Sequence, residues 1–533
     1  MLPFLNAESD NSKKYTIAFR GLNYGEDWVD GELSDCKNLS SAKFPCLSQS
    51  FARSVEKTYE DGCSTLFVKD GLIEVIGRNL YHDGNEIGQL HSGARKQMAA
   101  VGNYVVIFPD KMAYNVETGE LTDMGVHLNV ETATFTDSLI SIGSELPSGG
   151  LGSIFKVGDA ITISGCTKCP ENNKTVIVRS LNSNTLYFYE NTFTACENCS
   201  ITISRDIPDL DYICESNYRL WGTKGNTIYG SKYGDPFNFQ AFDGLSGDSY
   251  TIDVATEGNF TGCIAYNSHI CFFKENTLHK LYGNKPSNFQ LVTSQVPGVQ
   301  SLSDRSMCIV NDTLYYKGVN GVYAYTGSVP ELISSKLGSP MPLFMACACS
   351  DGDRYYISGA TEVGDSIKGA LFVYDLRRDI WLKEDNIGCN DMVFFQQHVY
   401  LLTTGDELVK IGAEPSDSDV PKVAWSATFC PFHETVNERK GYSKFHMRLE
   451  LDSGTWLAVD IKRDTDTKWE EVYQIPVEKM SEEEKAVHGI GYMRTVTMPI
   501  VPARCDSVEI RLRGEGDFIL RTFIREFFVG SDV

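Results

Sequence analysis

Long hydrophobic runs are absent from this chain of 533 residues. No stretch approaches about 18 consecutive apolar residues, so the sequence predicts no transmembrane helix. The opening residues also lack a basic segment followed by an apolar one, which is the pattern of a secretory signal peptide. We therefore expect a protein without a membrane segment, made and folded in a cytoplasm.

Positive charge is also scarce. The chain has 48 Lys and Arg residues against 71 Asp and Glu residues, which gives a net charge of -23. A negatively charged surface repels the phosphate backbone of nucleic acids, so the charge argues against specific nucleic-acid binding.

Catalytic motifs are missing as well. No G-x-S-x-G, H-E-x-x-H, Walker A or G-x-G-x-x-G pattern stands in a convincing context, and the nine histidines are scattered. We therefore predict that the chain is not an enzyme. Acidic residues are plentiful, so a propeller glycosidase, which needs two paired carboxylates, stays an alternative.

Helical periodicity is nearly absent, apart from a capped acidic stretch at residues 481–485. Elsewhere, runs of four to eight residues rich in Val, Ile, Tyr, Phe and Thr are broken by Gly, Asn, Asp or Pro, which is typical of strands and tight turns. The sequence therefore predicts an all-β protein.

An aromatic hairpin recurs about every 35 to 50 residues, the period of β-propeller blades. We predict about seven blades, with six or eight blades or an array of sandwiches as alternatives. Residues 16–19 are predicted to add a strand to the last blade and close the ring. The seven groups centre on residues 64–81, 98–115, 219–231, 269–282, 313–325, 354–374 and 399–411.

Two segments depart from this repeat. Alternating strands within an interruption of the repeat predict a small inserted β-barrel, and strict alternation after about residue 420 predicts an antiparallel β-sandwich. The predicted domains are an N-terminal arm with the ring-closing segment at 1–50, a first propeller segment at 51–128, the inserted barrel at 129–207, a second propeller segment at 208–419 and the sandwich at 420–533.

Two C-x-x-C pairs carry the sharpest chemical signal. Cys166 and Cys169 form one pair, Cys196 and Cys199 form the other, and both fall inside the predicted insertion. Such pairs supply four thiolates for a tetrahedral ion, so we predict a structural Zn site that staples a domain with a small core. One or two disulfides, or free thiols, are the alternatives. A redox role is less favoured because no helix N-terminus follows either pair.

Several short phrases resemble those of a known family. They resemble the propeller-containing virion proteins of tailed bacteriophages, called tail nozzle or tail stabilisation proteins. The four-cysteine insertion is not a feature expected of that family. The phrases lie at residues 21–23, 31–33, 38–41, 44–48, 219–222, 228–232, 235–239, 502–506 and 514–516, with Arg53.

The resemblance implies a non-enzymatic structural component of a phage tail, located in the virion and assembled in the bacterial cytoplasm. It implies a homo-oligomeric ring below the portal and adaptor that also meets distal tail or fibre proteins. DNA would pass through its channel during ejection without specific binding. A host-receptor or glycan-binding tail module is the main alternative function.

Overall fold

The computed structural model describes residues 11–363, 366–412, 422–434, 438–452, 454–464, 466–476, 491–501 and 503–529. Strands and five short 3-10 helices are the regular elements of these residues, which confirms the all-β prediction. No helix in this part of the chain is long and apolar enough to cross a membrane. The capped stretch at 481–485 lies outside the described residues.

The chain divides into two compact units. Unit 1 comprises Met1–Tyr59, Asn320–Tyr325 and Glu331–Val533, and unit 2 comprises Glu60–Val319 and Thr326–Pro330. The five 3-10 helices are η1 (Gly150–Ser153), η2 (Pro170–Asn172), η3 (Pro286–Asn288), η4 (Asp304–Ser306) and η5 (Ser335–Leu337).

Seven four-stranded sheets follow one another through the described residues, and each predicted hairpin group falls inside one of them. The first four comprise β7 (Cys63–Val68), β8 (Leu72–Ile76), β9 (Asn79–His82) and β10 (Asn85–Gln89); β11 (Gln97–Val101), β12 (Tyr104–Phe108), β13 (Met112–Asn115) and β14 (Glu120–Asp123); β22 (Tyr212–Ser216), β23 (Arg219–Lys224), β24 (Thr227–Gly230) and β25 (Tyr250–Asp253); and β26 (Gly262–Tyr266), β27 (His269–Lys274), β28 (Thr277–Tyr282) and β29 (Gln290–Ser294).

The remaining three sheets comprise β30 (Cys308–Val310), β31 (Thr313–Lys317), β32 (Val322–Tyr325) and β33 (Glu331–Leu332); β34 (Phe344–Ser350), β35 (Arg354–Val363), β36 (Ser366–Asp375) and β37 (Ile380–Lys383); and β38 (Cys389–Phe395), β39 (His398–Thr403) and β40 (Glu407–Ile411) with β6 (Arg53–Thr58).

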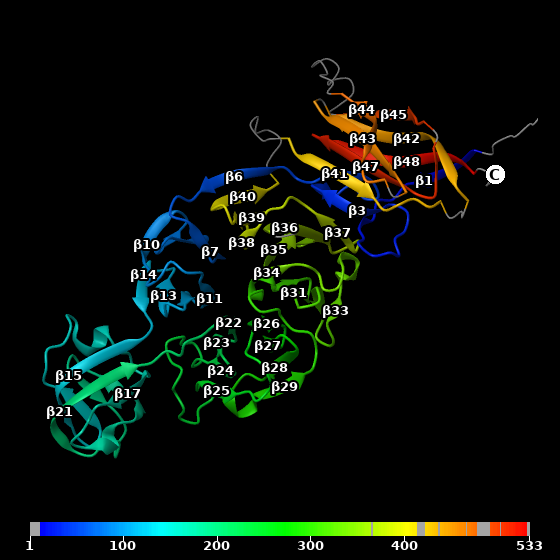
Figure 1. Cartoon of the computed structure of the whole chain (residues 1–533). Helices are drawn as coiled ribbons and strands as arrows, with labels where there is room; N and C mark the ends of the chain where they lie inside the picture. Colours follow the sequence, from blue (N-terminus) through cyan, green and yellow to red (C-terminus); the bar gives the residue numbers. More distant parts are fainter. Residues whose placement is uncertain are drawn as a thin grey trace, which may run out of the picture. The chain divides into compact units, whose positions relative to one another are not determined.

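Side-chain alternation packs successive sheets of unit 2 against one another. Val105 of β12 is buried with Ile73 of the preceding sheet, whereas its neighbour Val106 is buried with Leu220 of the following sheet. Because alternate residues of a strand face opposite sides, each such strand fills two cores. Figure 1 shows the first strands β7, β11, β22 and β26 on the inner side of this arrangement, with β10, β14, β25 and β29 outside.

The fourth strand of the last sheet corrects one prediction. Residues 16–19 do not supply it, because β1 (Asn11–Thr16) pairs with β48 (Phe518–Val529). Instead β6 pairs with β40 across Arg53–Thr58. The sequence pattern missed β6 because an outer strand needs few apolar residues, and most of its side chains are half-buried or exposed.

The C-terminal sandwich has two sheets, and the predicted N-terminal arm is part of both. One sheet has the order β4-β5-β48-β42-β45 with β1 and β46 attached, and the other has the order β2-β3-β41-β47-β43-β44. The strands not yet bounded are β2 (Gly21–Leu22), β3 (Glu32–Lys37), β4 (Leu39–Ser40), β5 (Leu47–Gln49), β41 (Ala424–Phe429), β42 (Lys440–Asp452), β43 (Trp456–Arg463), β44 (Glu470–Ile475), β45 (Gly491–Pro499), β46 (Arg504–Cys505) and β47 (Val508–Glu515).

The two sandwich sheets meet through aromatic rings. Trp425 stacks on Phe518 with 3.8 Å between ring centroids, and Phe429 stacks on Phe523 at 5.8 Å. The strands at residues 11–49 were missed as sandwich strands because all five are short, with two to six residues each, and four of them contain polar residues.

The inserted domain lies between β14 and β22. Its seven-stranded sheet has the order β18-β17-β21-β15-β16-β20-β19 and covers a core of its own. The strand pairing leaves the sheet open at β18 and β19, so closure into a barrel stays a prediction. Its strands are β15 (Val126–Phe135), β16 (Leu139–Ile142), β17 (Ala160–Ser164), β18 (Thr175–Ile177), β19 (Ser180–Leu181), β20 (Thr185–Tyr187) and β21 (Cys196–Arg205).

A buried polar contact anchors this domain to the loop between β24 and β25. The Asn238 side chain, 1% exposed, accepts a hydrogen bond from the Ala160 amide at 2.8 Å and donates to Asp159 at 3.4 Å. Arg205 donates to the same Asp159 carboxylate at 2.6 Å. The insertion is thus held by charged and amide groups that are all buried.

Candidate metal centre

The four predicted cysteines come together at one end of the inserted domain. Cys166 follows β17 after Gly165, whose φ of +79° suits glycine, and Cys169 directly precedes η2. Cys196 and Cys199 lie on β21 opposite β15. The sequence prediction of one shared site is therefore consistent with the chain path.

A distortion of β21 puts Cys196 and Cys199 on the same side. In a regular strand, residues three apart face opposite sides of the sheet. Here the β15–β21 register shifts between Val130 and Phe135, and Asn198 takes a left-handed φ of +52°. This bulge re-aims the two thiols toward one point.

The sulfur atoms are close enough to share one ion. The Sγ atoms of Cys196 and Cys199 are 2.7 Å apart, and those of Cys166, Cys196 and Cys199 all lie within 4.8 Å of one another. The Cys169 thiol is not part of this group of three, although it is near enough to Cys196 to help lower the pKa of Cys196. Sulfur atoms around tetrahedral zinc are about 3.8 Å apart, which follows from Zn–S bonds of about 2.3 Å. The thiols of Cys166, Cys196 and Cys199 therefore fit a Zn²⁺ ion after a small separation of the closest pair, and Cys169 would have to move closer to become the fourth ligand.

Thiol pKa values show how the cluster holds charge. Burial raises the pKa of Cys199 to about 12, and the hydrogen bond to Cys196 raises the pKa of Cys169 to about 11. Hydrogen bonds from Cys199 and Cys169 lower the pKa of Cys196. Protein groups alone thus favour one thiolate, and a bound dication would stabilise the others.

Two asparagines hold the backbone beside the two cysteine pairs, and neither was predicted. Asn173 binds both backbone groups of Cys166, at 2.9 Å to the amide and 3.1 Å to the carbonyl. Asn172 is fully buried and binds both backbone groups of Thr194, each at 2.9 Å. Consecutive asparagines shortly after a C-x-x-C pair are the only signal in the sequence that could have indicated this support.

Lys168 joins the two cysteine pairs directly. Its ammonium donates to the Glu197 carbonyl at 2.9 Å and to the Asn198 carbonyl at 2.7 Å. The same positive charge also contributes to the lowered pKa of Cys196. Lys168 therefore holds the second pair in place and favours a thiolate there.

Comparison with known proteins leaves the family open. No family model matches the chain, and no curated protein matches it. Among solved structures, KlHsv2 with loop 6CD replaced by a Gly-Ser linker is similar at 8% identity and a TM-score of 0.26, over 60% of this chain and 96% of that chain. Hsv2 of Kluyvelomyces marxianus is similar at 9% identity and a TM-score of 0.26, over 61% and 97%.

A glycoside hydrolase structure is similar at 10% identity and a TM-score of 0.21, over 58% of this chain and 96% of that chain. TM-scores this low establish neither a shared fold nor a shared function.

Proposed function

We propose that this chain is a non-enzymatic structural protein of a bacteriophage tail, a nozzle or stabilisation component attached below the portal and adaptor. In this proposal the seven four-stranded sheets form a seven-bladed β-propeller. The observation that supports the propeller is the run of seven such sheets, which the inserted domain interrupts once. Packing alternate side chains into two neighbouring cores is how propeller blades bury both faces.

Residues within the phage-like phrases have architectural roles, which supports this proposal. Arg219 is 1% exposed and donates to the carbonyls of Ser231 at 2.7 Å and Ser246 at 3.0 Å, so it shapes the loop that follows β24. Asn238 in the same loop anchors the insertion. The phrases that resemble the phage family therefore include side chains, such as Arg219 and Asn238, that hold the fold together.

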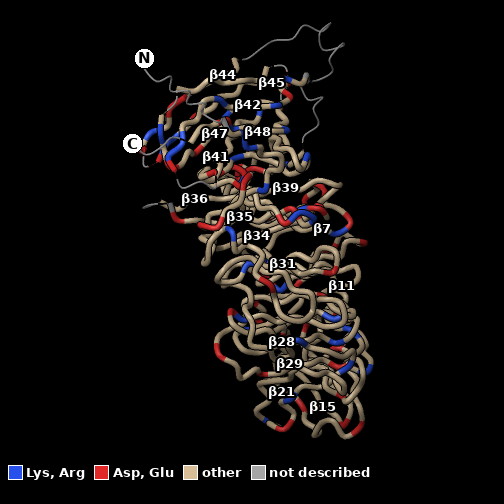
Figure 2. The backbone as a smooth tube through the Cα atoms, turned by 90° about the vertical axis from the view of Figure 1, so that its right-hand side faces the viewer, with Lys and Arg blue, Asp and Glu red and all other residues tan. Residues whose placement is uncertain are grey.

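The charge of the chain suits a channel for DNA. Acidic and basic residues both occur along each unit (Figure 2), and the total is -23. Acidic side chains repel the phosphates of DNA and make no favourable contact with them. DNA would therefore slide past such subunits without being held. Head-to-tail contacts between copies would close a ring.

The inserted domain is stapled by one Zn²⁺ ion in this proposal. Cys166, Cys196 and Cys199 lie close enough together to hold it, and Cys169 would be the fourth ligand. The ion would supply cross-linking and charge neutralisation with no catalytic role. Convergence of both pairs on one point favours the metal over two separate disulfides. A reducing cytoplasm disfavours disulfides further.

The position of perturbed carboxyl groups favours a structural role over hydrolysis. Among the described residues, the carboxyl groups with a raised pKa are Asp35 and Asp517, each raised mainly by burial although part of its side chain is exposed. Both belong to the sandwich. The neighbouring carboxylate Asp452 also raises the pKa of Asp517. This pair lies in the sandwich, whereas a propeller glycosidase would place its two carboxyl groups, about 5 to 9.5 Å apart, on the propeller.

Assembly on the portal and adaptor tests the proposed function. Purified chain is mixed with portal–adaptor complex from the same source and weighed by mass photometry, with portal lacking adaptor as the control. We expect a closed ring that forms on the adaptor complex only. A chain that ignores the adaptor and hydrolyses oligosaccharides would contradict the proposal.

A further inference from the structure

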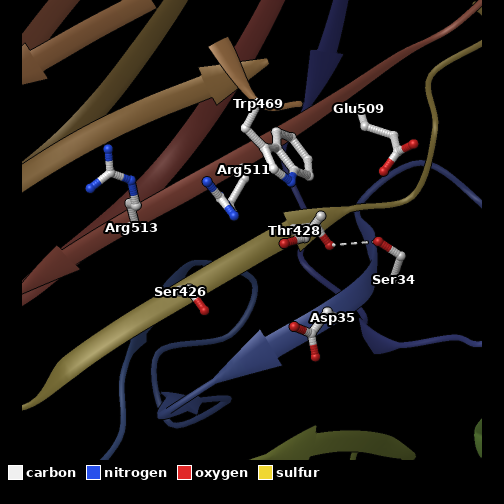
Figure 3. A pocket seen from close by; sticks show the side chains of 8 residues that line it. All are labelled: Ser34, Asp35, Ser426, Thr428, Trp469, Glu509, Arg511 and Arg513. Atoms are coloured by element: carbon white, nitrogen blue, oxygen red, sulfur yellow. Dashed lines mark hydrogen bonds between the residues drawn. The ribbon is translucent and has the colours of Figure 1, made fainter. Parts of the chain in front are cut away.

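A polar groove crosses the outer face of the sandwich sheet that contains β3, β41 and β47. Its volume is about 610 Å³. Figure 3 shows Trp469, which precedes β44, standing beside the side chains of β47 above the strands β41 and β3. The side chains that matter below are Asp35, Ser426, Thr428, Trp469, Arg511 and Arg513.

A buried carboxylate fixes the arginines of this groove. Asp460 is 2% exposed, although it lies on the solvent side of the sheet. It accepts hydrogen bonds from Arg511 at 2.7 and 2.9 Å and from Arg513 at 2.9 Å. The Arg511 guanidinium also lies 4.5 Å from the centroid of the Trp469 ring. The groove is therefore built of side chains with fixed positions.

The opposite side of the groove is shaped by a bulge. The β3–β41 register shifts between Leu33 and Asp35. The Ser34 hydroxyl is turned toward the Thr428 carbonyl at 3.4 Å (Figure 3). Both Ser34 and Asp35 consequently line the groove, although adjacent strand residues ordinarily face opposite sides.

Charge balance determines which ligands fit. Arg511 and Arg513 are neutralised by Asp460, and Arg513 also pairs with Glu471. Lys462 pairs with Glu509 at 2.8 Å. No surplus positive charge is left to select an anion. The groove instead offers guanidinium groups that donate hydrogen bonds, a carboxylate that accepts them, hydroxyls that donate and accept them, and an indole ring.

We propose that this groove binds a neutral oligosaccharide. Sugar hydroxyls donate and accept hydrogen bonds together, which matches a wall that mixes Arg, Asp, Ser and Thr side chains. Arg511 and Lys462 lie 4.5 and 5.3 Å from the centroid of the Trp469 ring, so the apolar C–H face of a sugar ring would pack against the part of the indole that these two cations leave uncovered. This binding site goes beyond the proposed structural function and does not depend on it.

A glycan array with neutral and acidic oligosaccharides tests the proposal on the full chain. The strongest neutral binder is then titrated calorimetrically against the wild type, Trp469→Ala and Asp35→Asn. Phe242→Ala serves as the control, because Phe242 is exposed on a loop of the other unit. Thermal melting confirms that each variant is folded.

We expect a neutral oligosaccharide to bind, with affinity lowered at least about tenfold by Trp469→Ala and by Asp35→Asn, and unchanged in the control. If Trp469→Ala does not fold, the affinity of Asp35→Asn alone tests the proposal. Asp35 is exposed, so its substitution should leave the fold intact. Absence of any neutral binder, preference for acidic glycans, or full affinity in the folded variants would overturn the proposal.

Discussion

Arg525 joins residues from both ends of the described chain. Its guanidinium, 2% exposed, binds Glu434 at 2.6 Å and the Thr16 hydroxyl at 2.6 Å, and it lies 3.2 Å from Asp30. One buried charge thus holds β1 and β48 in a common sandwich. No sequence pattern indicated this, because the partners are up to 509 positions apart.

Removal of this arginine should destabilise the sandwich strongly. Arg525→Ala removes the ion-pair partner of the buried Glu434, which typically costs about 3 to 5 kcal/mol. Arg521→Ala is the matched control on the same strand, because Arg521 is half exposed and its pair with Glu450 contributes about 1 kcal/mol or less. Urea unfolding measures both variants. Equal losses would contradict the assigned role of Arg525.

Zinc affinity should rise with pH. Without metal, the thiols of Cys169 and Cys199, with pKa values of about 11 and 12, are protonated at neutral pH. Zinc binding must displace these two protons, so affinity should rise about a hundredfold per pH unit between pH 6 and 8. Competition with a chelator measures it. A flat profile would show that these thiols do not bind the ion.

The cysteine spacing pointed to the candidate ligands, three of which lie within reach of one ion, but not to how they are held. The C-x-x-C pairs are visible in the sequence, whereas Asn172 and Lys168 act through carbonyl and amide groups of distant backbone. Backbone partners of this kind depend on the fold and leave no pattern of residue types. The bulge around Asn198 was equally hidden, since it arises from the pairing of β15 with β21.

At the scale of elements, the hairpin period predicted the middle strands of the sheets and, in the first two sheets, the edge strands β7 and β11, but it missed outer strands such as β6 and β14. Strands such as β23 and β27 are buried along most of their length, and their aromatic runs are readily recognised. Outer strands such as β6 and β14 alternate weakly and have exposed residues. Burial on both faces, which produces the apolar signal, is found in middle strands such as β23 and β27.

The anchor of the insertion should depend on a single amide side chain. Asn238→Ala leaves the Ala160 amide and the Asp159 carboxylate short of a buried partner, which costs about 1 to 3 kcal/mol. Hydrogen exchange at residues 156–162 should accelerate. Gln240→Ala is the control, since Gln240 contacts Thr162 at a half-buried position. Equal acceleration in both variants would contradict a specific role for Asn238.

At the scale of the whole molecule, the net charge of -23 should oppose self-association at low salt. Like-charged copies repel, and salt screens this repulsion once the Debye length falls toward about 8 Å near 0.15 M. Ring formation followed by mass photometry should therefore strengthen as salt rises from about 0.02 to 0.15 M. Weaker rings at higher salt would indicate complementary charges across the contact instead.

Cryo-electron microscopy of purified virions tests the structural role most directly. We expect the chain as a ring below the adaptor, with each subunit showing a seven-bladed propeller, the inserted domain and the sandwich. Virions that lack the chain, or that carry it only at a position remote from the DNA channel, would contradict the proposed tail function.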